Sequence, residues 1–267
     1  MGKLLRKVTS LFRELSPVKY AYPALDIFLP GKRQLHLVGS IHMGTRDMKP
    51  LPATLLHRLN KADALIVEAD ITGGVSPFAH SESHPPLAQR LPADNLETLT
   101  RLCDELSIDA EMIATLPGWQ VALMLQAQQA QRLGLRPDYG IDYQLLQAAK
   151  QRQLTVMELE GPDAQLELLK ALPGNGLSLL TDTLQHWHTN ARLLQTMVSW
   201  WLETPPGQNQ VALPTTFCSE LNDVLMHQRN RRWCEVLERL PAGRYVVAVG
   251  ALHLYGEGNL PDLLKGR

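Results

Sequence analysis

Two histidines of this chain stand in the same local frame, three residues after a glycine that ends an apolar run. They are His42 in Gly-Ser-Ile-His and His253 in Gly-Ala-Leu-His. Two further apolar runs end in acids, Glu68 and Glu160. Imidazole and carboxylate groups can transfer protons or bind divalent cations. Because a carboxylate at the end of an apolar strand is costly to bury without a positive partner, these four residues predict a polar site.

Such a site needs strands that end at a common edge. The β-prone segments lie at 34–39, 64–68, 154–160 and 244–249. The expected helices lie at 52–61, 94–133 with a break at 117–118, 142–151, two between 165 and 201, and 217–240. Strands that alternate with helices predict an α/β fold, a central mixed, mainly parallel sheet flanked by helices. Ligands bind at the carboxyl ends of strands in such sheets, so the two histidines and the two glutamates should lie together.

We expect a single domain over 1–267 with a large helical insertion at about 85–240, interrupted by the strand at 154–160. Residues 1–16 have apolar positions at helical spacing, broken by charged and hydroxyl residues. This pattern predicts an amphipathic helix rather than a secretory signal. The helix is expected to pack on its own domain, with weak contact to a membrane surface as the alternative. The uncharged stretch 112–131 contains a proline and five glutamines, so no transmembrane segment is expected.

The composition narrows the class of protein and its partners. Lys and Arg number 26 against 27 Asp and Glu, which gives a net charge of -1. No basic field for a nucleic acid is therefore expected. The three cysteines show no Cys-x-x-Cys spacing, which fits neither a disulfide framework nor a structural zinc cluster. The cysteine pattern and the lack of a signal segment predict a cytoplasmic location.

The remaining histidines are expected to have no role in the site. His36 lies within a predicted strand and His57 on a helix, where both are structural. His80 and His84 lie in a polar loop and are expected to be solvated. The pair at 186 and 188 differs by two positions, which places the side chains on different helical faces. The tryptophan pair at 200–201 is expected to pack in a core.

The ordered set of motifs resembles the TraB/GumN family, whose wider superfamily includes the Tiki proteases, the erythromycin esterases and a haem-binding lipoprotein. The likeness covers about 35–264, nearly the whole chain. The motifs are Gly39-Ser40-Ile41-His42, the strand end at Glu68, Tyr139-Gly140-Ile141-Asp142, Leu159-Glu160 with Gln165, Arg229-Asn230, and Gly250-Ala251-Leu252-His253 with Gly256.

The resemblance implies a metal-dependent hydrolase with His42, Glu68 and His253 as the metal ligands. Two imidazoles and one carboxylate suit Mn²⁺, Co²⁺ or Zn²⁺ and leave positions for water and substrate. The metal would lower the pKa of the bound water and polarise a scissile carbonyl. The substrate is expected to be a peptide or a small molecule.

Three more residues are candidates for catalysis. Glu160 or Asp142 could accept the proton of the water, and Arg229 could bind a substrate carboxylate or the developing oxyanion. Each of the last two has a structural alternative. Asp142 could cap the helix that follows it, and Arg229 could form an ion pair with an acid at a strand end.

Three functions stay open at this point. The first is a metal-dependent peptidase or amide or ester hydrolase. The second is a metal-independent esterase of the erythromycin-esterase type, in which the same histidines and glutamate activate water as general bases. The third is a non-catalytic module that binds haem or another small ligand through the histidines.

Overall fold

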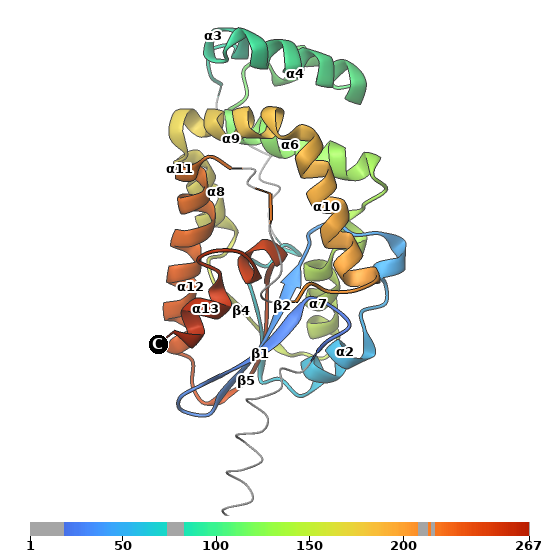
Figure 1. Ribbon diagram of the computed structural model, residues 1–267, viewed down its shortest axis with the longest axis vertical. Coiled ribbons are helices and arrows are strands. Elements are labelled where there is room, and N and C mark those ends of the chain that lie inside the picture. Colours follow the sequence, from blue (N-terminus) through green and yellow to red (C-terminus); the bar gives the residue numbers. More distant parts are fainter. Residues whose placement is uncertain (1–18, 74–82, 208–212, 215–216, 267) are drawn as a thin grey trace, which may run out of the picture.

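Five strands form one sheet in the order β1-β2-β5-β3-β4 (Figure 1). The computed structural model describes residues 19–73, 83–207, 213–214 and 217–266. The strands are β1 (Ala24–Leu29), β2 (Arg33–Ser40), β3 (Ala64–Val67), β4 (Thr155–Glu158) and β5 (Gly243–Gly250). Neighbouring strands are parallel except for the antiparallel pair β1 and β2. The predicted mixed, mainly parallel sheet is therefore confirmed.

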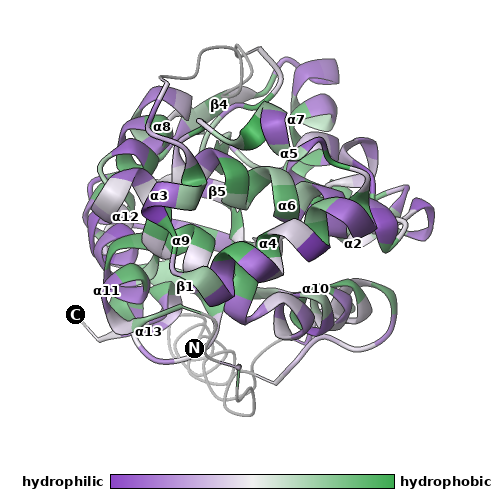
Figure 2. Cartoon of the chain, turned by 90° about the horizontal axis from the view of Figure 1, so that it is seen from above, coloured by the Kyte–Doolittle hydropathy of each residue, from purple (hydrophilic) through white to green (hydrophobic). Residues whose placement is uncertain are grey.

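Helices cover both faces of the sheet, which confirms the α/β fold (Figure 1). The central strand β5 is buried from Tyr245 to Val249, and a parallel strand covered on both faces has such a continuous apolar run. One apolar core joins the sheet to α12 (Gln228–Glu238) and α13 (Leu260–Lys265). A second core, on the other face, joins it to α2 (Ala53–Asn60) and α7 (Ile141–Gln151). The hydrophilic residues lie mainly on the outer sides of these helices (Figure 2).

The sequence analysis missed β1, the antiparallel strand at the edge of the sheet. Asp26 interrupts its apolar run, although its alternate positions 25, 27 and 29 are buried leucine and isoleucine, the period-two signal of a strand. Asp26 lies opposite His36 on β2, and Asp26 Oδ1 is 2.8 Å from His36 Nδ1. His36 is 4% exposed, so its predicted structural role is confirmed.

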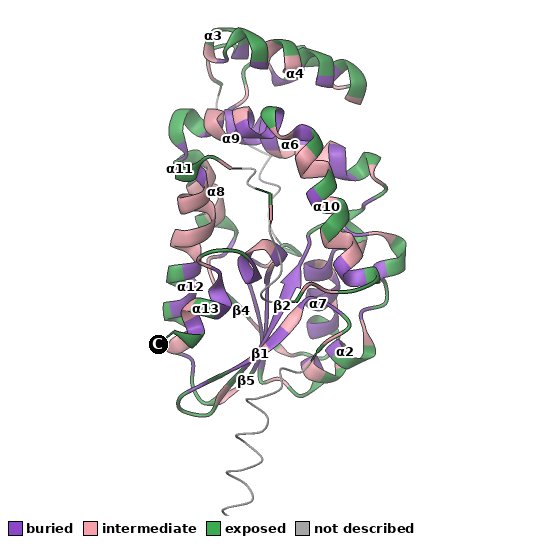
Figure 3. Cartoon of the chain, in the orientation of Figure 1, coloured by how far each residue is buried: buried purple, intermediate pink, exposed green. Residues whose placement is uncertain are grey.

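A third core consists of helices alone and lies away from the sheet (Figure 3). It contains residues of α3 (Leu87–Arg90), α4 (Ala93–Leu106), α5 (Ala110–Ile113), α6 (Gly118–Arg132), α9 (Pro173–Gln185) and α11 (Ser219–Asn222). The prediction of two helices between 165 and 201 was wrong. Three are present, α8 (Pro162–Lys170), α9 and α10 (Trp187–Leu202), because the chain breaks again at His186. The pair at 200–201 is buried, as predicted.

The predicted helix at 217–240 begins at Ser219 and ends at Glu238, and one turn inside it is not α-helical. Residues Asp223–His227 form a π-helical turn, η3, between α11 and α12. Among the residues that the structure describes, the 3-10 helices are η1 (Arg46–Met48), η2 (Pro137–Tyr139) and η4 (Ala251–Leu254). π-Helical turns occur often beside functional sites, and this one directly precedes the segment that carries Arg229.

Over the described part of the chain, no helix is both long and apolar enough to cross a bilayer. The helix expected at 1–16 lies outside the described residues, and so does His80.

Candidate functional site

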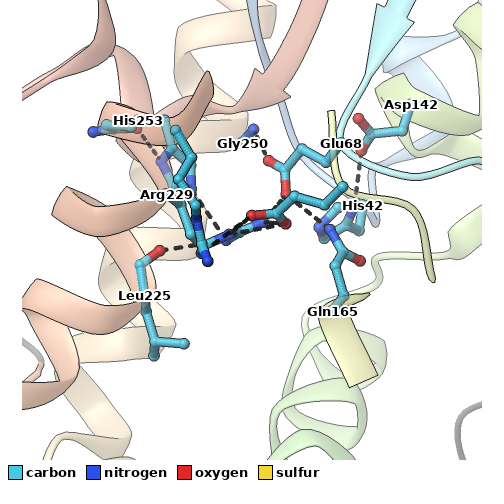
Figure 4. A network of polar contacts seen from close by, with 11 residues as sticks. His42, Glu68, Asp142, Gln165, Leu225, Arg229, Gly250 and His253 are labelled. Atoms are coloured by element: carbon cyan, nitrogen blue, oxygen red, sulfur yellow. Dashed lines mark hydrogen bonds and ion pairs between the residues drawn. The ribbon is translucent and has the colours of Figure 1, made fainter. Parts of the chain in front are cut away.

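Four parallel strands that neighbour one another carry the predicted site residues at their carboxyl ends. In the sheet order β2-β5-β3-β4 these residues are His42, His253, Glu68 and Glu160. Parallel strands end at the same edge, so the topology places all four there. Figure 4 shows three of them, His42, Glu68 and His253, around Arg229 of α12.

Arg229 binds both glutamates at this edge. Its Nε donates to Glu160 Oε1 and Oε2 at 3.0 and 3.1 Å, and its Nη2 donates to Glu160 Oε2 at 2.9 Å. The same Nη2 donates to Glu68 Oε2 at 2.6 Å. The three side chains are between 8% and 12% exposed. The predicted alternative for Arg229, an ion pair with an acid at a strand end, is therefore present with two acids.

Glu68 is ionised and fully engaged. Its Oε1 accepts a hydrogen bond from the Gly250 amide at 2.6 Å, and its Oε2 also accepts one from Gln165 at 3.3 Å. Burial by itself raises the pKa of a carboxyl group. The charge of Arg229, with smaller effects of both histidines and the Gly250 amide, outweighs burial and lowers the pKa of Glu68 to about 2.

His253 is buried and its tautomer follows from its neighbours. Asn230 Nδ2 donates to the Gly258 carbonyl at 2.9 Å, which leaves Asn230 Oδ1 to face His253 Nδ1 at 2.7 Å. An amide oxygen only accepts, so Nδ1 carries the proton and Nε2 carries the lone pair. This Nε2 lies 3.4 Å from Arg229 Nη1. Burial, with the charge of Arg229, lowers the pKa of His253 to about 4 despite the attraction of Glu68.

His42 has the opposite environment. Its side chain is 65% exposed, and its Nδ1 lies 2.8 Å from Oδ2 of Asp142, which is 7% exposed. The negative charge of Asp142 is the main cause that raises the pKa of His42 to about 9. The alternative that Asp142 caps its helix is wrong, because the N-cap of α7 is Gly140 and Asp142 points to His42 (Figure 4).

Backbone contacts bring Asp142 to His42. The loop after β2 pairs with the segment before α7 through hydrogen bonds between Gly44 and Arg136 and from the Ile141 amide to the Ile41 carbonyl. A Cβ atom at Gly140 would lie 2.1 Å from the His42 carbonyl oxygen. Only glycine permits this approach, which is why the Gly-Ile-Asp segment can reach the loop that carries His42.

Three residues of the site received no role in the sequence analysis. Gln165 and Asn230 were noted only as parts of motifs, and Trp233 was missed. The Trp233 ring lies 4.5 Å from Arg229 Cζ and 4.5 Å from the His253 ring, between centroids. Its spacing of four residues from Arg229 on one helix places both on the same face, and this signal could have identified it.

The predicted metal ligands do not fit a divalent cation in this arrangement. Both oxygens of Glu68 are engaged by Gly250, Gln165 and Arg229, and the free Nε2 of His253 faces Arg229. Among the residues that the structure describes, no three His, Cys, Asp or Glu side chains form a group that could hold a metal ion. The Mn²⁺, Co²⁺ or Zn²⁺ ion therefore stays a prediction.

A cavity of about 370 Å³ adjoins the site. Asn230, the partner of His253, and Leu252 lie in its wall. The remaining lining is mixed: Phe217, Met226 and Tyr255 are apolar or aromatic, and polar side chains such as His227 and Glu257 lie among them. Space for a group of moderate size is therefore present beside His253.

The mainly parallel sheet with charged residues along the carboxyl edge defines an α/β protein with a polar site at its strand ends. The TraB/PrgY/gumN family model matches residues 26–267, and the chain belongs to this family. The chain is similar to "Uncharacterized protein YbaP" of Escherichia coli (strain K12) and to the protein of the same name of Shigella flexneri. Both are 56% identical over 262 residues, which cover 98% of this chain and 99% of each relative. No solved structure matches.

Proposed function

We propose that this protein hydrolyses ester or amide bonds of a peptide or small molecule, with His42 as the group that accepts the proton of the attacking water. The observation that carries the proposal is the pair of His42 and Asp142. A buried carboxylate lies 2.8 Å from Nδ1 of an exposed imidazole, so Nε2 can accept a proton once His42 is unprotonated, which requires a pH above its pKa of about 9. Asp142 and Glu160 were the predicted proton acceptors, but each is engaged, Asp142 with His42 and Glu160 with Arg229.

In the proposed reaction, the water oxygen forms a bond with the carbonyl carbon while His42 Nε2 takes the proton. The carbonyl oxygen becomes an oxyanion. When the bond to the leaving oxygen or nitrogen breaks, His42 returns the proton to that atom.

Arg229 supplies a hydrogen-bond donor for the oxyanion in this proposal. Its Nη1 has two long contacts, 3.3 Å to the Leu225 carbonyl and 3.4 Å to His253, whereas its Nη2 binds the glutamates at 2.6 and 2.9 Å. Nη1 is therefore the atom that is most available to a substrate oxygen. Glu68 and Glu160 hold the guanidinium in place.

The cavity that Asn230 and Leu252 line supports a substrate with an apolar group that extends beyond the histidine and glutamate side chains of the site. Phe217, Met226 and Leu252 provide apolar surface, and Asn230 links the cavity to the site. An acyl chain or an apolar peptide side chain matches this lining.

The test compares the wild type with His42→Gln on p-nitrophenyl esters of increasing chain length and on peptide anilides. We expect kcat/KM to fall by about 10² to 10⁴ in the variant, the usual contribution of a general base. His188→Gln is the matched control, since His188 is also exposed and lies on α10 outside the site. A His42→Gln variant with wild-type activity would contradict the proposal.

Metal-dependent hydrolysis is the second candidate, and one observation favours it. Both histidines have Nδ1 held by an oxygen, Asp142 or Asn230, as histidines that ligate metals through Nε2 usually do. Dialysis against a chelator, followed by addition of Mn²⁺, Co²⁺ or Zn²⁺, separates the two candidates through the rate of hydrolysis. A visible absorption spectrum tests the haem alternative.

The cytoplasmic location also stays a prediction.

A further inference from the structure

We infer that the guanidinium of Arg229 occupies the place that a divalent cation would take at this edge of the sheet, so that Arg229 and such a cation exclude each other. The inference goes beyond the proposed hydrolysis. It concerns which cation the site accepts, and it holds or fails independently of any reaction.

The atoms around Arg229 are those that a divalent cation would need. Glu68 Oε2 and Glu160 Oε2 lie 2.6 and 2.9 Å from Nη2, and His253 Nε2 lies 3.4 Å from Nη1. Carboxylate oxygens and an imidazole lone pair are donor types that suit Mn²⁺ or Zn²⁺, but with the guanidinium between them the described side chains form no group that could hold a metal ion. The guanidinium lies among these three donors, so they cannot bind an ion while it stays.

The charges of Glu68, Glu160 and Arg229 also indicate that Arg229 and a divalent cation exclude each other. With Arg229 in place, two carboxylates and one guanidinium sum to -1. A divalent cation in place of Arg229 would make this sum zero, whereas a divalent cation added beside it would leave two positive groups adjacent in a site where the side chains are only 8% to 12% exposed. Like charges at such distances repel strongly in a poorly hydrated site. Exchange is therefore favoured over joint binding.

Arg229 also has contacts that a metal ion could not replace. Its guanidinium carbon lies 4.5 Å from the centre of the Trp233 ring, and its Nη1 donates to the Leu225 carbonyl at 3.3 Å. A planar cation gains from stacking on an aromatic ring and from two-point binding of carboxylates. These contacts favour the guanidinium in the wild-type protein.

The test is a titration of the full chain with Mn²⁺, in which electron paramagnetic resonance measures the concentration of the free ion. We expect no saturable binding to the wild type up to about 1 mM. Arg229→Ala frees the carboxylate oxygens and the imidazole nitrogen. This variant should bind one Mn²⁺ at least about tenfold more tightly than the wild type does. The matched control is Arg232→Ala. Arg232 lies on the same helix, 3.8 Å from Glu160 Oε1, but its side chain is 57% exposed and outside the donor set, so this variant should behave as the wild type.

Methylguanidinium provides a second measurement. Added to Arg229→Ala, it should occupy the vacated place and weaken the apparent binding of Mn²⁺ in a competitive manner. If Arg229→Ala does not fold, Arg229→Met replaces it, because methionine fills part of the same space without a positive charge. This variant should bind Mn²⁺ more tightly than the wild type does.

Two results would overturn the inference: saturable binding of Mn²⁺ to the wild type below about 1 mM, or no binding to a folded Arg229 variant. Because no substrate is present, neither result depends on whether the protein is a hydrolase.

Discussion

The two Gly-x-x-His segments of this protein give histidines of opposite character. His42 is exposed and pairs with a carboxylate, and its pKa is raised to about 9. His253 is 4% exposed and pairs with an amide oxygen, and its pKa is lowered to about 4. At neutral pH, His42 is therefore protonated and His253 is neutral. The repeated motif fixes where each histidine stands at the sheet edge, but it does not fix the charge.

The partner of each histidine comes from a distant part of the chain. Asp142 lies in the first turn of α7, which reaches His42 through the close backbone approach at Gly140. Asn230 lies on α12, next to Arg229. The charged partner raises the pKa of His42, whereas the neutral partner keeps His253 within the buried cluster.

The largest expected effect separates the two histidines by stability. His253→Ala removes a ring packed against Trp233 and leaves Asn230 Oδ1 buried without its donor. We expect the free energy of unfolding to fall by about 2 to 3 kcal/mol. His42→Ala should cost about 1 kcal/mol or less, since its imidazole is mostly exposed. Urea denaturation of both variants measures the difference, and equal losses would remove the contrast.

Much of the site could be predicted from the sequence, because its residues follow strand ends. Apolar runs located four of the five strands. The parallel order then brings His42, Glu68, Glu160 and His253 to one edge without any knowledge of side-chain contacts. The strand β1 was not predicted because Asp26 interrupts its apolar run, and the residue that pairs with this acid, His36, lies on another strand.

The protonation states could not be predicted, because they depend on distances between segments far apart in sequence. The sequence left open whether Asp142 caps a helix, and only its distance of 2.8 Å from His42 decides between the alternatives. The position of Arg229 depends on α12 and on the π-helical turn before it, for which the sequence offers no evident signal. The family resemblance implied a metal at His42, Glu68 and His253, and the sequence did not reveal that the last two of these contact a guanidinium.

A second prediction removes the charge that distinguishes His42. In Asp142→Asn the pKa of His42 should fall from about 9 toward its ordinary 6.5, because the negative charge of Asp142 is the largest cause of the shift. A general base works only when unprotonated. The rise of kcat/KM with pH should therefore move about one to two units toward acid, while the maximum falls because the ring loses its orientation.

The stability of the wild type should show the same titration. Because the pKa of His42 is raised in the folded state, the protonated imidazole stabilises the folded protein. This contribution is complete below the unfolded pKa of 6.5 and is lost as the pH rises through about 9. Asp142→Asn should lack this loss between the two values. Asp138→Asn is the matched control, because Asp138 is exposed in the preceding turn η2. An unchanged pH profile in Asp142→Asn would mean that another group sets the profile.

The smallest effect is expected from giving His253 the kind of partner that His42 has. Asn230→Asp places a carboxylate oxygen where Oδ1 now lies 2.7 Å from His253 Nδ1, and the added charge should raise the pKa of His253 by about one unit. Burial and Arg229 still lower it, so it should stay below that of His42. Titration of the His253 ring protons by NMR measures the pKa shift. Asn222→Asp is the control, because Asn222 lies on α11 rather than on α12, which carries Asn230. A pKa that remains near 4 would show that burial, rather than the choice between amide and carboxylate, separates the two histidines.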